Sequence, residues 1–284
     1  MDQFQQNPNP TEQTMQGKYM PMTSVASGLL QQIAQDVYSY TVQIVNIAII
    51  DLHDGFVLID AGMPESGTTI ISTIKDQFGE DRKPIAIILT HGHFDHIGGL
   101  EELLNHWDVP VYAHKLELPF LTGQINYPEP DGTVEGGLVA KLSPTFPHNG
   151  INLKGKVEAL PDDGTIPVLQ EWRYVHTPGH SPGHISLFRE SDRTLIAGDA
   201  FVTVKQDSLY KVLVQKQELH GPPRYLTTDW QAAWDSVKEL ATLKPEVAIT
   251  GHGLPMAGEE LKTGLGKLAQ NFGETEIPDY GKYV

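Results

Sequence analysis

The chain has 284 residues and a formal net charge of −16 at pH 7, from 20 basic and 36 acidic side chains. This negative charge argues against nucleic-acid partners and anionic membrane surfaces, which are bound by clustered lysine and arginine. The hydrophobic fraction of 39% is high enough for a buried core, and the lack of cysteine excludes disulfides, thiolate metal ligands and a cysteine nucleophile.

The first part of the chain predicts alternating strands and helices after a polar start. Residues 1–24 are rich in Gln, Asn and Pro and are expected to form a flexible arm before a single domain over 25–284. They lack a signal-peptide pattern, and no apolar run approaches the ~20 residues of a transmembrane helix, so we expect a cytoplasmic protein. Apolar patterning predicts strands at 37–40, 45–51 and 56–60, a helix from Ser66 to a capping Gly79, a strand at 85–90, a helix at 96–107 and a strand at 109–114.

The segment 115–165 is different, because it is rich in Pro and Gly and has little periodicity. We predict that it forms a lid over the site, or an oligomer contact, and that substitutions at Phe120 or Tyr127 change substrate preference more than metal content. Regular patterning returns with strands at 172–175, 185–189 and 194–197, a helix at 229–243 that begins with a Thr228–Gln231 capping box, a core strand in EVAITGHG and a last helix at 259–271. Strand clusters separated by single amphipathic helices indicate two packed sheets with helices outside.

A run of candidate metal ligands, T-H-G-H-F-D-H, lies between a predicted buried strand and a predicted helix. His91 and His93 are two residues apart and can point the same way from extended backbone, whereas Asp95 and His96 begin a turn and can face a second ion. Imidazole and carboxylate ligands suit zinc, manganese or iron.

Three later residues complete the pattern, because each follows an apolar strand and is flanked by glycine. They are His180 in H-T-P-G-H, Asp199 in A-G-D and His252 in T-G-H-G. Any one of them alone would more commonly be a structural histidine or a turn aspartate. Together with the first cluster they predict a metal site at the carboxyl ends of the strands.

These motifs resemble the H-x-H-x-D-H signature of the metallo-beta-lactamase superfamily and its later His, Asp and His, over about Val37 to His252. The resemblance implies an α+β fold, a four-layer alpha-beta/beta-alpha sandwich with the site at one edge of the sheets. It implies that one metal ion is held by His91, His93 and His180, and the other by Asp95, His96 and His252, with Asp199 between them. It also implies that Asp60, in FVLIDAG, orients a ligand imidazole.

The function predicted from the resemblance is hydrolysis of a small lactone, ester or thioester by a hydroxide that bridges two metal ions, most simply two Zn²⁺ per chain, with Mn²⁺ or Fe as alternatives. Asp95 and His252 are predicted to act in catalysis as well as in metal binding. Two alternatives stay open: a mononuclear iron persulfide dioxygenase, and a non-catalytic metal-binding protein of the same fold. Elemental analysis separates the first alternative, and activity on esters and lactones separates the second.

The substrate class is less determined than the metal site. The chain is similar to hydroxyacylglutathione hydrolases, but only 284 − 252 = 32 residues follow His252, too few for the C-terminal helical domain of those enzymes. Lactonases place a tyrosine soon after the bridging aspartate, whereas Phe201 follows here and Tyr210 is the first tyrosine. We predict substrate contacts for Tyr210 and Arg224, a small-molecule substrate without a nucleic-acid or membrane partner, and leave a homodimer open.

Overall fold

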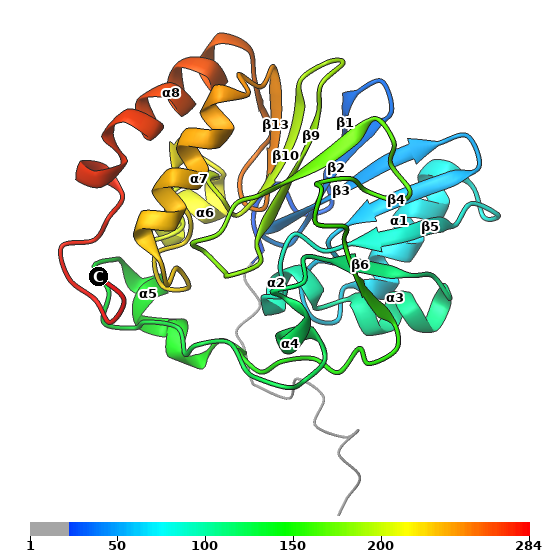
Figure 1. Ribbon diagram of the computed structural model, residues 1–284, viewed down its shortest axis with the longest axis horizontal. Helices are drawn as coiled ribbons and strands as arrows, with labels where there is room; N and C mark the ends of the chain where they lie inside the picture. The colour runs from blue at the N-terminus through cyan, green and yellow to red at the C-terminus, as the bar shows by residue number, and fades with distance from the viewer. Residues whose placement is uncertain (1–22) are drawn as a thin grey trace, which may run out of the picture.

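The structure, a computed structural model, describes residues 23–284 and consists of two β-sheets packed face to face with helices on both outer faces (Figure 1). The four-layer sandwich that the sequence predicted is therefore confirmed. The predicted arm, 1–24, lies almost entirely outside the described residues. Within the described part of the chain, no helix combines the length and the apolar character needed to cross a bilayer.

The first sheet has seven strands, and their spatial order is their order along the chain. They are β1 (Leu30–Ala34), β2 (Val37–Val42), β3 (Val45–Leu52), β4 (Gly55–Ile59), β5 (Pro84–Ile88), β6 (Val111–Ala113) and β7 (Val157–Ala159). The strands β1 to β4 pair antiparallel, whereas β4, β5, β6 and β7 pair parallel. The carboxyl ends of β4 and β5 therefore meet at one edge of the sheet.

The second sheet has five strands in the order β14-β13-β10-β9-β8. They are β8 (Trp172–His176), β9 (Ile185–Arg189), β10 (Thr194–Gly198), β13 (Val247–Thr250) and β14 (Met256–Ala257). Because β9 is antiparallel to both β8 and β10, and β10 is parallel to β13, three strands run in one direction and end at one edge. A separate small sheet pairs β11 (Val202–Val204) with β12 (Gln217–His220).

The sequence of β3 shows why the first sheet is covered on both faces. Ile47 and Ile49 pack with the helices α1 (Gly67–Phe78) and α3 (Leu100–His106), while Ala48 and Ile50 pack against the second sheet. Successive side chains of a strand point to opposite faces, so a continuous apolar run suits a strand buried on both sides. Helices α7 (Trp230–Thr242) and α8 (Gly258–Thr275) cover the outer face of the second sheet (Figure 1). Burial of each such isoleucine stabilises the folded state by roughly 1.5–3 kcal/mol. The strand ends therefore extend from a well-packed core.

The helix predicted at 96–107 is in fact two helices, α2 (Phe94–Ile97) and α3, separated at Gly98 and Gly99. The backbone there packs directly on the turn after β4: the Gly98 amide donates to the Gly62 carbonyl at 2.8 Å, and a Cβ on Gly98 would lie 2.1 Å from a backbone nitrogen. Apolar periodicity could not reveal this break, because the break depends on a contact with a distant segment.

The predicted capping box of the helix at 229–243 is wrong in its residues, although the helix is present as α7. Asp229 caps it instead, because its carboxylate accepts a hydrogen bond from the Ala232 amide at 2.9 Å. The Thr228 and Asp229 amides both donate to the Gly179 carbonyl, and the helix begins at Trp230, one residue later than predicted.

The segment 115–165 contains short regular elements despite its weak periodicity. They are α4 (Leu118–Leu121), α5 (Leu138–Leu142), the 3-10 helix Ser143–Thr145 and the edge strand β7. Sequence reasoning also missed α6 (Leu209–Val214), which lies between β11 and β12. Elements of three to six residues are too short to display a period, so only their tertiary contacts define them.

Candidate metal centre

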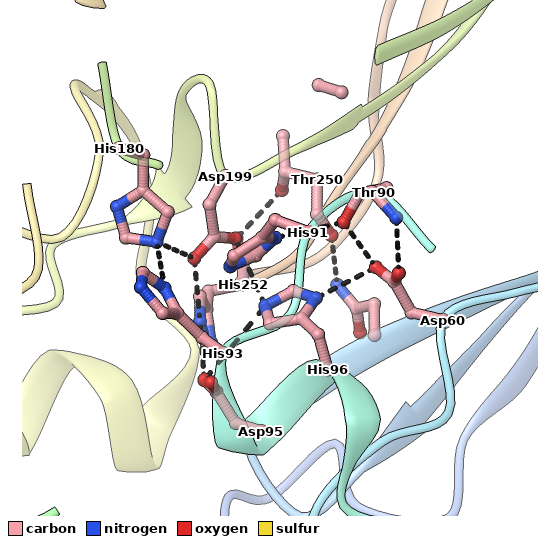
Figure 2. A network of polar contacts seen from close by, with 12 residues as sticks. Asp60, Thr90, His91, His93, Asp95, His96, His180, Asp199, Thr250 and His252 are labelled. Atoms are coloured by element: carbon pink, nitrogen blue, oxygen red, sulfur yellow. Dashed lines mark hydrogen bonds and ion pairs between the residues drawn. The ribbon is translucent and has the colours of Figure 1, made fainter. Parts of the chain in front are cut away.

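The seven candidate ligands come together where the strand ends of both sheets meet (Figure 2). His91 and His93 follow β5, and Asp95 and His96 lie on α2. From the second sheet, His180 follows β8, Asp199 follows β10 and His252 follows β13. All seven side chains are buried, with exposed fractions between 0% and 6%. The structure therefore brings together the seven residues that the sequence predicted as ligands, five of them in loops that follow strands and two on α2.

Their donor atoms form three groups that could each hold an ion, with the atoms of a group within 4.8 Å of one another. These groups are His91, His93 and His180; His91, His96 and Asp199; and Asp95, His96 and His252. Nδ1 of His93 lies 2.9 Å from Nε2 of His180, and Nε2 of His252 lies 3.3 Å from Oδ2 of Asp95. The first and third groups share no residue.

Asp199 lies between these two separate groups. Its Oδ2 is 3.5 Å from Nε2 of His180 and 3.3 Å from Nε2 of His252, and its Oδ1 is 3.6 Å from Nε2 of His96. Figure 2 shows the carboxylate facing both sides of the cluster. A carboxylate in this position can contact an ion in either group.

Four of the five imidazoles are oriented through Nδ1, which leaves Nε2 directed into the cluster. Nδ1 of His91 contacts Thr90 Oγ1 at 3.0 Å, and Nδ1 of His96 contacts Asp60 Oδ2 at 2.8 Å. Nδ1 of His180 contacts Thr227 Oγ1 at 3.2 Å, and Nδ1 of His252 contacts the Ile44 carbonyl at 3.0 Å. Such partners fix the tautomer and the ring orientation of metal-binding histidines. Asp60 therefore lies where the sequence predicted a carboxylate that orients a ligand.

The charges divide the cluster into a neutral side and an acidic side. Burial, only partly offset by the charge of Asp95, lowers the pKa of the His93 imidazole to about 4. Burial alone would lower the pKa of His252, but the charges of Asp199 and Asp95 and their hydrogen bonds with the imidazole together outweigh burial and raise that pKa to about 10. The neutral imidazole of His93 presents a lone pair to a cation, whereas a cation that binds His252 displaces a proton.

The polar atoms at the centre of the cluster fit a metal ion. Within residues 23–284, four of them are buried and make no hydrogen bond: His91 Nε2, His96 Nε2, Asp95 Oδ1 and Asp199 Oδ1. Buried polar atoms in native proteins nearly always have partners, and leaving one without a partner costs about 1–3 kcal/mol. These four atoms are all imidazole nitrogen or carboxylate oxygen, the donor types that zinc, manganese and iron accept.

The family model of the metallo-beta-lactamase superfamily matches residues 40–252, which include all seven candidate ligands. The chain belongs to this superfamily. The probable metallo-hydrolase YflN of Bacillus subtilis (strain 168) is 53% identical to it over 258 residues, which are 90% of this chain and 98% of that protein. Hydroxyacylglutathione hydrolase GloC of Haemophilus influenzae is 28% identical over 113 residues, 40% of this chain and 48% of that enzyme. By its family, the chain is a metallo-hydrolase, and it carries a His/Asp metal-binding cluster.

Solved structures show the same fold. The protein TTHA1623, crystallised in a di-iron-bound form, is 26% identical and matches 82% of this chain and 93% of its own with a TM-score of 0.52. The B3 metallo-beta-lactamase BLEG-1 is 22% identical and matches 80% and 91% of the two chains with a TM-score of 0.54, which shows the shared fold alone.

The two predicted substrate contacts lie elsewhere than in the ligand cluster. Tyr210 is 72% exposed on α6. Arg224 is paired with Glu135 at 3.2 Å and Asp207 at 3.5 Å, and it lines a cavity of about 520 Å³ whose lining includes none of the seven ligands. Arg224 thus already has acidic partners within the protein. Contact of Tyr210 and Arg224 with substrate stays a prediction.

Sequence reasoning missed how two further side chains support the site. His184, four residues after His180, accepts a hydrogen bond from the Asp199 amide at 2.9 Å. Glu117 is completely buried and contacts two of the ligand-bearing loops. No motif or spacing distinguishes a glutamate four residues after the end of β6, so only the tertiary contacts identify it.

Proposed function

We propose that the protein is a binuclear metal-dependent hydrolase that cleaves a small lactone, ester or thioester. The observation that carries the proposal is the presence of two ligand groups without a common residue, with Asp199 between them. A single-ion site would need only one of these groups. A carboxylate between two divalent cations offsets their mutual repulsion and fixes their spacing.

The donor set favours zinc, with manganese and iron as alternatives. Five imidazoles and two carboxylates, without sulfur, suit all three ions, and three protein ligands per ion leave a coordination position for substrate or water. The di-iron form of TTHA1623 supports occupancy by two ions and keeps iron as an alternative. The name of GloC supports a thioester among the substrates to be tested.

The roles proposed for the side chains follow from their positions. Two divalent cations held there would acidify a water molecule and polarise the carbonyl oxygen of the substrate. Asp60 keeps the proton of His96 on Nδ1, so that Nε2 stays free to bind. Asp95 Oδ1 is buried without a partner among the described residues and can accept a proton from the attacking water. Asp95 can then pass this proton to the leaving group, while His252, whose Nδ1 faces the Ile44 carbonyl, would hold an ion next to Asp95 through Nε2.

Elemental analysis of the purified protein, followed by assays on lactones, esters and thioesters with and without chelator, tests the proposal. We expect two divalent metals per chain and chelator-sensitive hydrolysis of at least one class. Asp199→Asn should lower the metal content and remove most activity. Asp131→Asn is the matched control, because Asp131 is also a buried carboxylate, 3% exposed, but it contacts Thr133 and Lys282 instead.

Two results would contradict the proposal. One iron per chain, with no hydrolysis and rapid oxygen uptake in the presence of a persulfide, would make the protein a dioxygenase. Full metal content with no activity on any of the three carbonyl classes would make it a metal-binding protein of this fold.

A further inference from the structure

Glu117 is a buried carboxylate whose two oxygens each accept two hydrogen bonds. The residue directly precedes α4, in the segment 115–165, and its exposed fraction is 0%. Oε2 accepts from the Gly92 amide at 3.0 Å and from the Tyr127 hydroxyl. Oε1 accepts from the Gly183 amide at 2.7 Å and from the Ser181 hydroxyl at 2.8 Å.

Three of these donors belong to the two loops that supply the three-histidine group. Gly92 lies between His91 and His93, and Ser181 and Gly183 lie one and three residues after His180. The two loops come from different sheets, one after β5 and the other after β8. Glu117 is therefore a direct polar connection between them.

The sequence of both loops is adapted to this contact. A Cβ on Gly92 would lie 2.5 Å from the Tyr127 hydroxyl, and a Cβ on Gly183 would lie 2.9 Å from Glu117 Oε1 and 2.7 Å from the Glu117 amide nitrogen. Only glycine allows both loops to approach this closely. The glycines of T-H-G-H and H-S-P-G-H thus serve the contact with Glu117 and Tyr127.

Tyr127 strengthens the same connection from the side of the ligand. Its ring lies edge-on to the His93 imidazole, with centroids 4.7 Å apart, and stacks on Phe120 at 4.0 Å. His93 is the one cluster imidazole whose Nδ1 faces another ligand, so this ring contact helps to orient it. The position of Tyr127 indicates that its substitution acts through the ligand loop.

We propose that Glu117 is a positioning residue that holds the loop of His91 and His93 against the loop of His180, and so sets the affinity of the three-histidine group for its metal ion. The inference rests on the proposed binuclear function. It concerns one group only, because all four donors to Glu117 lie in or beside the loops of that group or in the segment 115–165.

Glu117→Gln tests the proposal with little change in shape. Each carboxylate oxygen of Glu117 accepts one hydrogen bond from a backbone amide, whose direction is fixed, and one from a hydroxyl group, which can rotate. The amide nitrogen of Gln has no lone pair to offer, so in either orientation it faces the amide of Gly92 or of Gly183 as a second donor. One loop must then detach, whereas the carboxylate accepts from both.

The measurement is a titration of chelator-treated protein with Zn²⁺ against a competing chelator, which gives two dissociation constants. We expect Glu117→Gln to weaken one of the two steps by about 10- to 100-fold, the usual effect of losing a partner that supports metal ligands. Asp131→Asn, the matched buried carboxylate, should change both constants by less than about twofold. Glu117→Gln should still weaken binding in a His252→Ala background, which keeps the three-histidine group, and should have no effect in a His180→Ala background.

Gly183→Ala is a second, independent perturbation, since its Cβ pushes the His180 loop away while Glu117 is retained; we expect the same selective loss. Wild-type affinities in both variants, equal weakening of both steps, or the same loss in Asp131→Asn would overturn the proposal. Wild-type protein that binds fewer than two Zn²⁺ would refute the proposed binuclear function instead, so the two failures are distinguishable.

Discussion

Replacing Asp60 by Asn should weaken metal binding by changing the tautomer of one ligand. Asp60 is buried just after β4, and it accepts hydrogen bonds from the Thr90 amide at 2.7 Å, the Thr90 hydroxyl at 2.7 Å and His96 Nδ1 at 2.8 Å. Its φ of 64° lies in the left-handed region, which Asn also tolerates, so the substitution preserves the backbone. The change therefore tests the carboxylate oxygen that faces His96.

The orientation of the new side chain is dictated by Thr90. The Thr90 amide is a fixed donor, so the Asn oxygen must face it and the Asn nitrogen takes the place of Oδ2. This nitrogen donates to His96 Nδ1, which moves the imidazole proton to Nε2, the atom that is directed into the cluster. The Thr90 hydroxyl can rotate and accept, so it does not oppose this arrangement.

The expected loss is about 10- to 100-fold in the affinity of the group that contains His96, equivalent to roughly 1.4–2.7 kcal/mol. The assay is Zn²⁺ titration against a competing chelator, with Asp131→Asn as the control and circular dichroism to show that the fold is retained. An Asp60→Asn protein that binds two zinc ions with wild-type affinities would refute the reasoning, because His96 would then not depend on its carboxylate partner.

Three further changes test other parts of the structure. His93→Ala should abolish hydrolysis while near-ultraviolet circular dichroism stays native, because the two sheets have their own apolar cores; an active variant would exclude His93 as a ligand. Thr227→Val removes the partner of His180 Nδ1 and should weaken Zn²⁺ binding about tenfold, whereas an unchanged dissociation constant would show that this contact does not orient the ring. Burial raises the pKa of Asp192, but hydrogen bonds from Arg189 and Thr194 outweigh it and hold that pKa below its ordinary value. A carboxylate whose pKa is lower in the folded state stabilises the fold above its unfolded-state pKa, and this stabilisation is lost as the pH falls through its folded-state pKa. Urea unfolding should therefore show a free energy of unfolding for Asp192→Asn that is lower by up to about 1 kcal/mol at pH 7, with a difference that shrinks below about pH 4. A difference that does not change with pH would contradict this assignment.

The sequence determined the class of fold and the members of the metal cluster. The continuous apolar run in β3 and the apolar stripe of α7 indicated buried strands with helices outside, because periodicity reports how many faces of an element are covered. The cluster was predictable because His91, His180 and Asp199 each follow a strand, and strands that run in one direction end at one edge. A local sequence pattern was sufficient to predict the position of a residue wherever that position depended only on the strand or helix next to it.

Contacts between segments far apart in the sequence could be decided only by the tertiary structure. The division of the helix at 96–107 depends on Gly98 packing against the turn after β4, and the cap of α7 depends on the Gly179 carbonyl. Glu117 is the clearest case, since its importance lies in four donors that come from three segments and from both sheets. Hydrogen-bond partners at long sequence separation leave no period or motif. The sequence therefore identified the candidate metal ligands, and only the tertiary structure identified the side chains that contact their loops.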